Sequence, residues 1–261
     1  MSAEPPASAG RDAAERLAAS FGFEAVDPAE KAGKVKAVFE SVAGRYDLMN
    51  DLMSLGVHRL WKEALVDWLL PRRGCRHLDV AGGTGDIAFR LLERLGGEAE
   101  VTLVDINPAM LEVGRDRALD RGWLGQIGWV AGDAERLPLP DRSFDAYTIA
   151  FGIRNVTHID RALAEARRVL RPGGRLIVLE FSRLAVPALR SAYDAYSLSL
   201  LPLIGKVVAG DAESYRYLAE SIRRFPDQAT FAGLVAAAGF EQVKVRNLSG
   251  GIAALHSAWR V

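Results

Sequence analysis

The stretch that decides the fold is Leu78-Asp79-Val80-Ala81-Gly82-Gly83-Thr84-Gly85-Asp86. It joins a short apolar run, a turn with three glycines and the start of an amphipathic segment, which is typical of a strand, turn and helix. Glycine lets a ligand approach the backbone closely, because no Cβ stands in the way. A second apolar run, 101–104, ends on Asp105, twenty residues after Gly85. A carboxylate at that place can accept hydrogen bonds from both hydroxyls of a ribose, so the sequence predicts a nucleoside-binding site.

Two nucleoside cofactors fit this pattern. Gly83-x-Gly85-x-x-Ala88, followed by Asp105, matches the fingerprint of dinucleotide-binding folds. Two acidic residues favour S-adenosylmethionine instead. Asp79 lies inside the first strand, where a dinucleotide fold has an apolar residue, and its carboxylate can anchor the amino-acid end of the cofactor. Asp133 follows a third apolar run, 127–131, and can accept a hydrogen bond from the adenine amino group.

A third feature also favours S-adenosylmethionine. The run Arg171-Pro172-Gly173-Gly174 leads into an apolar strand at 175–180. A Pro-Gly-Gly turn at this place resembles the class I methyltransferases. We therefore predict S-adenosylmethionine as the cofactor. The alternative is a plain tight turn with solvated acids, and it is disfavoured because four separate features follow one another in the expected order.

Length and composition suit one α/β domain with appendages. The chain has 261 residues, 49% of them hydrophobic, and no net charge, which allows a sizeable core. A nucleic-acid partner is not expected, because it would need a basic stripe. Four scattered histidines and one cysteine offer no metal-ligand spacing and no internal disulfide, so we predict no metal. No apolar run approaches the roughly 20 residues that span a bilayer.

From residue 75 onward apolar runs alternate with amphipathic segments. This alternation predicts an α/β, Rossmann-like fold, with a mostly parallel seven-stranded sheet covered by helices on both faces. The strands are expected at 75–81, 100–105, 126–131, 143–150, 173–181, 240–247 and 252–260. The helices are expected at 85–96, 108–121, 158–170 and 227–238. Such sheets bind ligands outside the carboxyl ends of their strands, where the acids described above lie, apart from Asp79.

The other segments are expected to surround this core. Residues 1–20 lack the apolar stretch of a signal peptide and are predicted to form a flexible or partly helical tail. Residues 21–261 are predicted to form a single methyltransferase domain. Its parts are a helical cap (21–71), a cofactor-binding core (72–183), a helical insertion on the substrate side (184–226) and a C-terminal helix with a strand pair (227–261).

One part of the insertion, 184–209, breaks the alternation. It is apolar and aromatic, and it carries no charge between Asp194 and Lys206. Because it follows the fifth strand, it is expected over the substrate side of the sheet. Two interpretations stay open. The segment is either an apolar lid or membrane-contacting face for a lipid substrate, or a helix buried on the domain.

Two further motifs are more specific than the glycine turn. The first contains Arg45-Tyr46-Asp47-Leu48-Met49-Asn50-Asp51 and, farther on, His58-Arg59-Leu60-Trp61-Lys62; the second is Phe151-Gly152-Ile153-Arg154-Asn155-Val156. Their combination resembles the ubiquinone/menaquinone biosynthesis C-methyltransferase family over about residues 20–261. The resemblance implies an enzyme that uses S-adenosylmethionine to methylate a ring carbon of a polyprenylated quinol. The ring is that of 2-polyprenyl-6-methoxy-1,4-benzoquinol or of demethylmenaquinol, which the residues do not distinguish.

The resemblance also implies the residues that contact the cofactor. They include Thr84, Asp105 at the ribose, and Asp133 with Ala134 around the adenine. Ala150 stands where family members commonly have a serine, so only its backbone can line the pocket. The full set of predicted cofactor-binding residues is Asp79, Ala81, Gly83, Thr84, Gly85, Asp105, Ile106, Asp133, Ala134 and Ala150.

The expected chemistry is an in-line methyl transfer to carbon. Loss of a phenolic proton makes the ring carbon more nucleophilic, and a second proton leaves that carbon afterwards, so the site needs a base or a polarised water. The resemblance implies that Arg154, held by Tyr46 and Asn155, poises this water. Because a guanidinium has a pKa above about 12, we expect Arg154 to stabilise the developing phenolate. Alternatively, Arg154 pairs with an acid such as Asp160, and Tyr46 is a core aromatic.

The quinol is a lipid, so the family resemblance implies a cytoplasmic protein with peripheral contact at the inner face of the bacterial membrane. Other quinone-biosynthesis enzymes are candidate partners, and a homodimer stays open because no sequence pattern decides it. Two other functions are considered, a non-catalytic cofactor-binding scaffold of a quinone-synthesis complex and a methyltransferase for another lipid. The intact glycine turn, Asp105 and Arg154 argue against the scaffold. The pair of Arg154 and Asn155 suits phenol oxygens better than an amine substrate.

Overall fold

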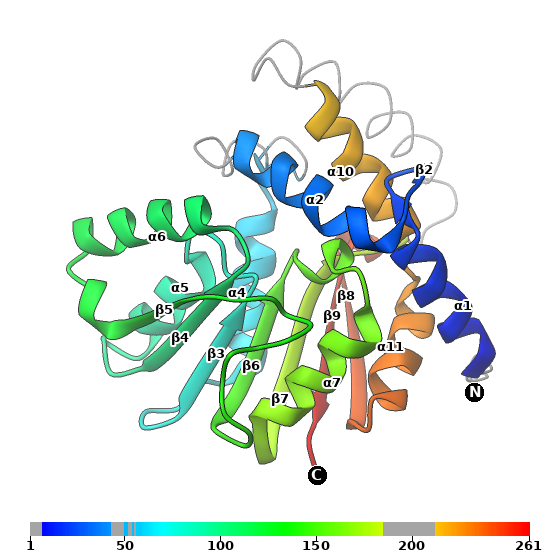
Figure 1. The fold of residues 1–261 in the computed structure, drawn as a ribbon. Helices are drawn as coiled ribbons and strands as arrows, with labels where there is room; N and C mark the ends of the chain where they lie inside the picture. Colours follow the sequence, from blue (N-terminus) through cyan, green and yellow to red (C-terminus); the bar gives the residue numbers. More distant parts are fainter. Residues whose placement is uncertain (1–6, 43–49, 52–53, 55, 185–211) are drawn as a thin grey trace.

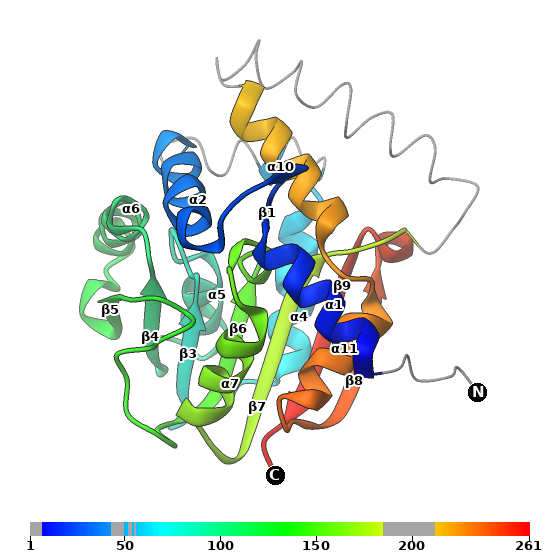
Figure 2. The same cartoon turned by 45° about the vertical axis from the view of Figure 1, so that its right-hand side comes forward.

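A seven-stranded sheet forms the centre of the computed structural model, which describes residues 7–42, 50–51, 54, 56–184 and 212–261 (Figures 1 and 2). The strands are β3 (Arg76–Val80), β4 (Glu100–Asp105), β5 (Ile127–Ala131), β6 (Phe144–Ala150), β7 (Leu170–Phe181), β8 (Glu241–Leu248) and β9 (Ala253–Trp259). Their order is β5-β4-β3-β6-β7-β9-β8. Strands β3 to β7 run parallel to one another, and β9 is antiparallel to both of its neighbours. The predicted mostly parallel sheet of seven strands is confirmed.

One strand starts earlier than predicted. β7 begins at Leu170 rather than at 173, because Leu170 pairs with Phe144 ahead of a register shift. The Pro-Gly-Gly turn therefore lies inside the strand as an irregularity. Gly173 adopts a φ of 79°, and its N–H donates a hydrogen bond to the carbonyl oxygen of Arg260.

Helices cover both faces of the sheet. One face packs against α4 (His58–Leu69), α5 (Asp86–Arg94) and α6 (Pro108–Asp120), and the other against α7 (Ile159–Val169) and α11 (Gln228–Ala237). Strand β7 shows why both faces are apolar. Ile177 and Leu179 belong to the first core, whereas Leu176 and Val178 belong to the second. Alternate side chains of a strand point to opposite faces, so a strand buried on both sides becomes a continuous apolar run.

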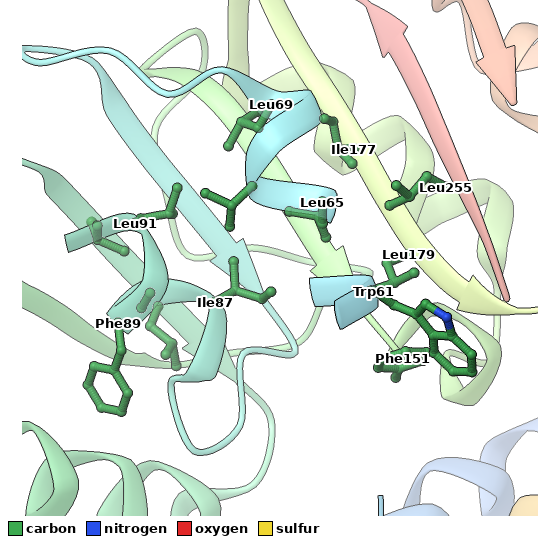
Figure 3. Close-up of a cluster of buried hydrophobic side chains, with 14 of the residues drawn as sticks. Trp61, Leu65, Leu69, Ile87, Phe89, Leu91, Phe151, Ile177, Leu179 and Leu255 are labelled. Atoms are coloured by element: carbon green, nitrogen blue, oxygen red, sulfur yellow. The ribbon is translucent and has the colours of Figure 1, made fainter. Parts of the chain in front are cut away.

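Helix α4 joins the predicted cap to the sheet (Figure 3). Trp61, Leu65 and Leu69 recur every four residues and so lie on one side of the helix, facing Ile177 and Leu179 of β7. The helix ends where Pro71 predicts, with Leu70 in the left-handed conformation at a φ of 52°. Helix α4 thereby fixes this part of the cap to the same face of the sheet as α5.

The N-terminal segments contain more structure than the sequence indicated. Residues 7–18 form helix α1 (Ala7–Ala18), which packs on α11 and α7 (Figure 2). We predicted a flexible or partly helical tail; the helix is present, but it is docked, because Ala13, Leu17 and Ala18 share one buried side. A short hairpin of β1 (Ser20–Phe21) and β2 (Glu24–Ala25) follows, and then α2 (Pro28–Val42).

Only part of the predicted insertion can be compared with the structure. Its last residues form α10 (Ala212–Arg224), which packs beside α2. Residues 185–211 lie outside the described residues, so the choice between a lid and a buried helix is not tested. Within the described ranges, no helix is long and apolar enough to cross a membrane.

Lys31 of α2 is a buried cation, with 1% of its surface exposed. Its Nζ donates hydrogen bonds to the carbonyl oxygens of Leu17, at 2.7 Å, and Val156, at 3.2 Å. Burial lowers the pKa of Lys31 to about 8, although Glu135 opposes this shift. Lys31 thus connects α1 to the loop after β6 and carries a charge that is disfavoured in the folded state.

We expect this charge to make stability depend on pH. In the unfolded chain Lys31 keeps its proton up to a pKa of about 10.4, whereas the folded protein releases it near pH 8. The unfolded state therefore binds more protons within this window, and stability rises with pH. The free energy of unfolding, measured with urea, should rise between pH 8 and 10 for the wild type relative to Lys31→Met, by up to about 1.4 kcal/mol per pH unit. A constant difference between the two proteins would contradict this assignment.

Candidate active site

A pocket opens at the carboxyl edge of the sheet, beneath α2. Its lining residues come from the segments that follow β3, β4, β5 and β6 and from one side of α2. They are Val80, Ala81, Gly83, Asp105, Ile106, Asn107, Met110, Gly132, Asp133, Ala134, Glu135, Phe151, Gly152, Asn155, Val156, Thr157, Ala32, Val35, Lys36 and Phe39. The pocket therefore lies where an open α/β sheet binds ligands.

The turn after β3 forms the floor of the pocket. Ala81 and Gly83 both have positive φ, 50° and 54°, which bends the chain sharply before α5. A Cβ on Gly83 would lie 3.0 Å from the Cε of Met110, so a side chain there would fill part of the pocket. On the facing turn, a Cβ on Gly152 would lie 2.5 Å from the Cβ of Ala81. The two turns can approach each other this closely only because residue 152 is glycine.

Asp105, at the end of β4, is held beside this turn. Its Oδ2 accepts a hydrogen bond from the Gly83 N–H and its Oδ1 accepts one from the Asn107 N–H, each at 2.8 Å. Burial raises the pKa of Asp105, and these N–H donors oppose the shift. Each carboxylate oxygen can accept a further hydrogen bond. Asp105 is thus oriented by the backbone and still able to receive two hydroxyl groups.

Asp105→Asn should weaken S-adenosylmethionine binding by about 10- to 100-fold, since a hydrogen bond to a charged group contributes about 1.5–3 kcal/mol. Isothermal titration with the cofactor would measure the change. Asp116→Asn, an exposed acid of α6, is the matched control and should bind like the wild type. Equal affinities for all three proteins would remove Asp105 from the nucleoside site.

Three more predicted residues lie together with Asp105 in the pocket. Asp133 is exposed, and its Oδ1 accepts a hydrogen bond from the Glu135 N–H at 2.9 Å, which shapes the turn after β5. Ala134 is buried beside it. Ile106 is 45% exposed and lines the pocket. An acid and two apolar side chains are suited to a flat base that carries an amino group.

The structure places four other residues that were predicted to bind the cofactor outside the lining of the pocket. Asp79 is buried within β3, where its Oδ1 accepts a hydrogen bond from the Thr148 hydroxyl at 2.8 Å. Burial raises the pKa of Asp79 to about 7. Thr84 accepts a hydrogen bond from Arg117, Gly85 precedes the first residue of α5, and Ala150 ends β6. The other carboxylate oxygen of Asp79, Oδ2, is buried and has no partner among the described residues.

Arg154 lies in the short 3₁₀ helix η3 (Ile153–Asn155), with 3% of its surface exposed. Its Nη1 donates hydrogen bonds to Glu180 Oε1, at 2.7 Å, and to the carbonyl oxygen of Phe151, at 2.6 Å. Its backbone N–H points to Glu180 Oε2 at 3.3 Å. The acid that pairs with Arg154 is therefore Glu180, near the end of β7, and not Asp160. The Nε of Arg154 is buried and has no hydrogen-bond partner among the described residues.

Asn155 lines the pocket next to Arg154. Its Oδ1 accepts a hydrogen bond from the hydroxyl of Tyr217, on α10, at 3.0 Å. Burial raises the pKa of this tyrosine, which keeps it in the protonated, donating form. Tyr46, the third predicted catalytic residue, lies outside the described residues. The described part of the structure thus brings Arg154 and Asn155 together and adds two residues that the sequence did not indicate, Glu180 and Tyr217.

Asn107 is another residue that the sequence did not indicate. It is 2% exposed, and its Oδ1 caps α6 by accepting a hydrogen bond from the Ala109 N–H. Its Nδ2 has no partner among the described residues, although it lies at the pocket. A buried donor without a partner is uncommon and fits a site that receives a polar ligand. The residues present therefore suit a nucleoside cofactor.

Comparisons with known proteins show which family this chain resembles. The model of the ubiE/COQ5 methyltransferase family matches residues 28–260. Ubiquinone/menaquinone biosynthesis C-methyltransferase UbiE from Brucella abortus is 59% identical over 93% of this chain and 91% of that protein. The protein of the same name from Brucella anthropi is 58% identical over 93% of both chains.

Solved structures share the fold. A S-adenosylmethionine-dependent methyltransferase from Thermotoga maritima aligns with a TM-score of 0.63 at 24% identity, covering 87% of this chain and all of that one. A second, from Aquifex aeolicus, aligns with a TM-score of 0.59 at 17% identity, covering 82% and 97%. The family model and the two relatives cover nearly the whole chain, so the chain belongs to the ubiE/COQ5 methyltransferase family.

Proposed function

We propose that this chain uses S-adenosylmethionine to methylate a ring carbon of a polyprenylated quinol in ubiquinone and menaquinone biosynthesis. The relatives that are 58–59% identical are named ubiquinone/menaquinone biosynthesis C-methyltransferase. The observation that carries the proposal is the pocket itself. It combines Asp105 and Asp133, at the ends of neighbouring strands, with Asn155 on the facing turn. A cofactor subsite and a polar group for the substrate thus share one cavity.

The pocket residues divide between the parts of the cofactor. Asp105 would hold the ribose, Asp133 with Ala134 and Ile106 the adenine, and the turn from Ala81 to Gly83 the amino-acid end. When bound, the cofactor supplies an electrophilic methyl group on a sulfonium. The turn leaves room for it, because a Cβ on Gly83 would fill part of the pocket.

Arg154 would act on the phenol oxygen of the substrate. Its Nη1 is occupied by Glu180 and Phe151, whereas its Nε has no partner among the described residues. A donor there stabilises negative charge on a phenolate, or holds the water that takes its proton. A guanidinium offers N–H donors and no acceptor atom, which argues against Arg154 as the base itself. Asn155, held by Tyr217, would fix the orientation of the ring.

The substrate also bears on where the protein acts. A polyprenyl tail partitions into a bilayer, so an enzyme that methylates the attached ring has to reach the membrane surface. We therefore propose a cytoplasmic protein that contacts the inner face of the membrane peripherally and works beside other quinone-biosynthesis enzymes. A homodimer is also open to test by measuring the mass of the protein in solution.

The decisive experiment is methyl transfer from labelled S-adenosylmethionine to two substrates, a prenylated methoxy-benzoquinol and demethylmenaquinol. Transfer to either quinol is expected, and the ratio of the two rates identifies the preferred ring. Binding of the cofactor without transfer to either quinol would favour another lipid substrate or a non-catalytic scaffold. S-adenosylhomocysteine binding, measured in parallel, shows whether the cofactor site is intact.

A further inference from the structure

A second cavity, of about 300 Å³, lies apart from the candidate active site. It is enclosed by α1, the end of α10, the start of α11 and the segment after β7, elements that meet on one side of the molecule (Figure 2). Its lining residues are Ala13, Arg16, Arg183, Arg223, Arg224, Pro226, Asp227 and Thr230. Four of these eight residues are arginines, and they come from three separate elements.

The lining contains one acid, Asp227. Asp227 is the N-cap of α11, and its Oδ1 accepts a hydrogen bond from the Thr230 N–H at 2.9 Å. Arg224 lies over the ring of Phe23, at 5.5 Å from its centroid, and donates to its carbonyl oxygen. Asp227 also attracts Arg183 electrostatically, so the lining holds four arginines against one acid.

Two of the arginines are free to bind a ligand. The side chains of Arg16 and Arg183 are exposed and form no hydrogen bond or ion pair with the described residues. Like charges around a hollow repel one another, and an anion between them relieves this repulsion. Guanidinium groups match the oxygens of a phosphate in a bidentate manner. The start of α11 adds the positive end of a helix dipole at the same place.

We propose that this cavity binds a phosphate group. Arg183 follows the carboxyl end of β7, and β7 runs parallel to the strands whose ends form the candidate active site. A phosphate presented by the headgroups of an anionic bilayer would therefore hold that edge of the sheet against the membrane. A free phosphate ion offers the same oxygens, and the experiment separates these two sources. The inference goes beyond the proposed function and does not depend on it.

The test uses the full chain and vesicles of phosphatidylcholine, with and without phosphatidylglycerol. Arg16→Gln/Arg183→Gln removes two cavity charges without breaking a side-chain hydrogen bond or ion pair among the described residues, although it also removes the attraction between Arg183 and Asp227. Because a basic residue near an anionic surface contributes about 1 kcal/mol, this variant should bind the phosphatidylglycerol vesicles at least about tenfold more weakly. Arg72→Gln/Arg115→Gln, which removes two exposed arginines elsewhere, should bind within about twofold of the wild type.

Two further measurements make the result specific. Arg16→Lys/Arg183→Lys keeps the charge but loses the planar fork, and should weaken binding less than the glutamine variant. Titration with inorganic phosphate, followed by calorimetry, tests the free ion. Phosphate binding that the cavity variant loses, with unchanged vesicle binding, supports the cavity with a free ion as its source. If the cavity and control variants bind both vesicles and phosphate alike, the proposal is wrong. Neither arm measures methyl transfer, so failure here is distinct from failure of the proposed function.

Discussion

Glu180→Ala is expected to lower the free energy of unfolding by about 3–5 kcal/mol, the usual cost of leaving one member of a buried ion pair without its partner. Both side chains are almost fully buried, Arg154 with 3% and Glu180 with 1% of the side-chain surface exposed. Glu180 also accepts a hydrogen bond from the Phe181 N–H. The carboxylate thus accepts hydrogen bonds from three donors, the Nη1 and backbone N–H of Arg154 and the backbone N–H of Phe181. Without it, each of these buried donors loses that acceptor.

A double variant shows whether the loss of stability in Glu180→Ala comes from the unpaired charge or from the lost packing. Arg154→Met/Glu180→Leu removes both charges and should be more stable than Glu180→Ala, because no uncompensated charge is left in the core. Urea denaturation of the two variants and the wild type gives the three free energies of unfolding. If Glu180→Ala unfolds at the wild-type urea concentration, the pair contributes nothing measurable and the assignment is wrong.

Arg154→Lys is expected to reduce kcat by about 100-fold or more, the typical effect of removing a donor to a developing oxyanion. Lysine keeps a positive charge for Glu180, so the fold should be retained, but it lacks the second edge of donors that faces away from this carboxylate. Affinity for S-adenosylmethionine should stay unchanged, because Arg154 does not line the cofactor pocket among the described residues.

Steady-state kinetics with a prenylated quinol and calorimetry with the cofactor test both parts of this expectation. Arg76→Lys, an exposed arginine paired with Glu100, is the matched control and should keep the wild-type rate. Full activity of Arg154→Lys would show that charge alone suffices at this position. Loss of cofactor affinity in the same variant would place Arg154 in the nucleoside site instead.

The fold was largely predictable from sequence because its signals are local. Apolar runs such as Leu176–Leu179 and turn glycines such as Gly83 report strand and turn positions without knowledge of distant residues. The site was less predictable because its contacts join distant segments. Glu180 is a charge inside an apolar run, which marks a buried acid, but nothing in the sequence shows that Arg154 is its partner. Asp79 poses the converse problem, since the sequence does not reveal whether a strand acid faces the ligand or supports the turn.

Because α1 docks on α11, its packing has to wait until α11 has been synthesised. Helix α1 covers residues 7–18, whereas α11 covers 228–237, so α1 leaves the ribosome well before the helix on which it packs. At about 5–20 residues per second, Leu17 stays without this partner for roughly 10 to 45 s. For that time a growing chain presents the apolar side of α1 to its surroundings, which makes this helix a natural place for a chaperone to bind.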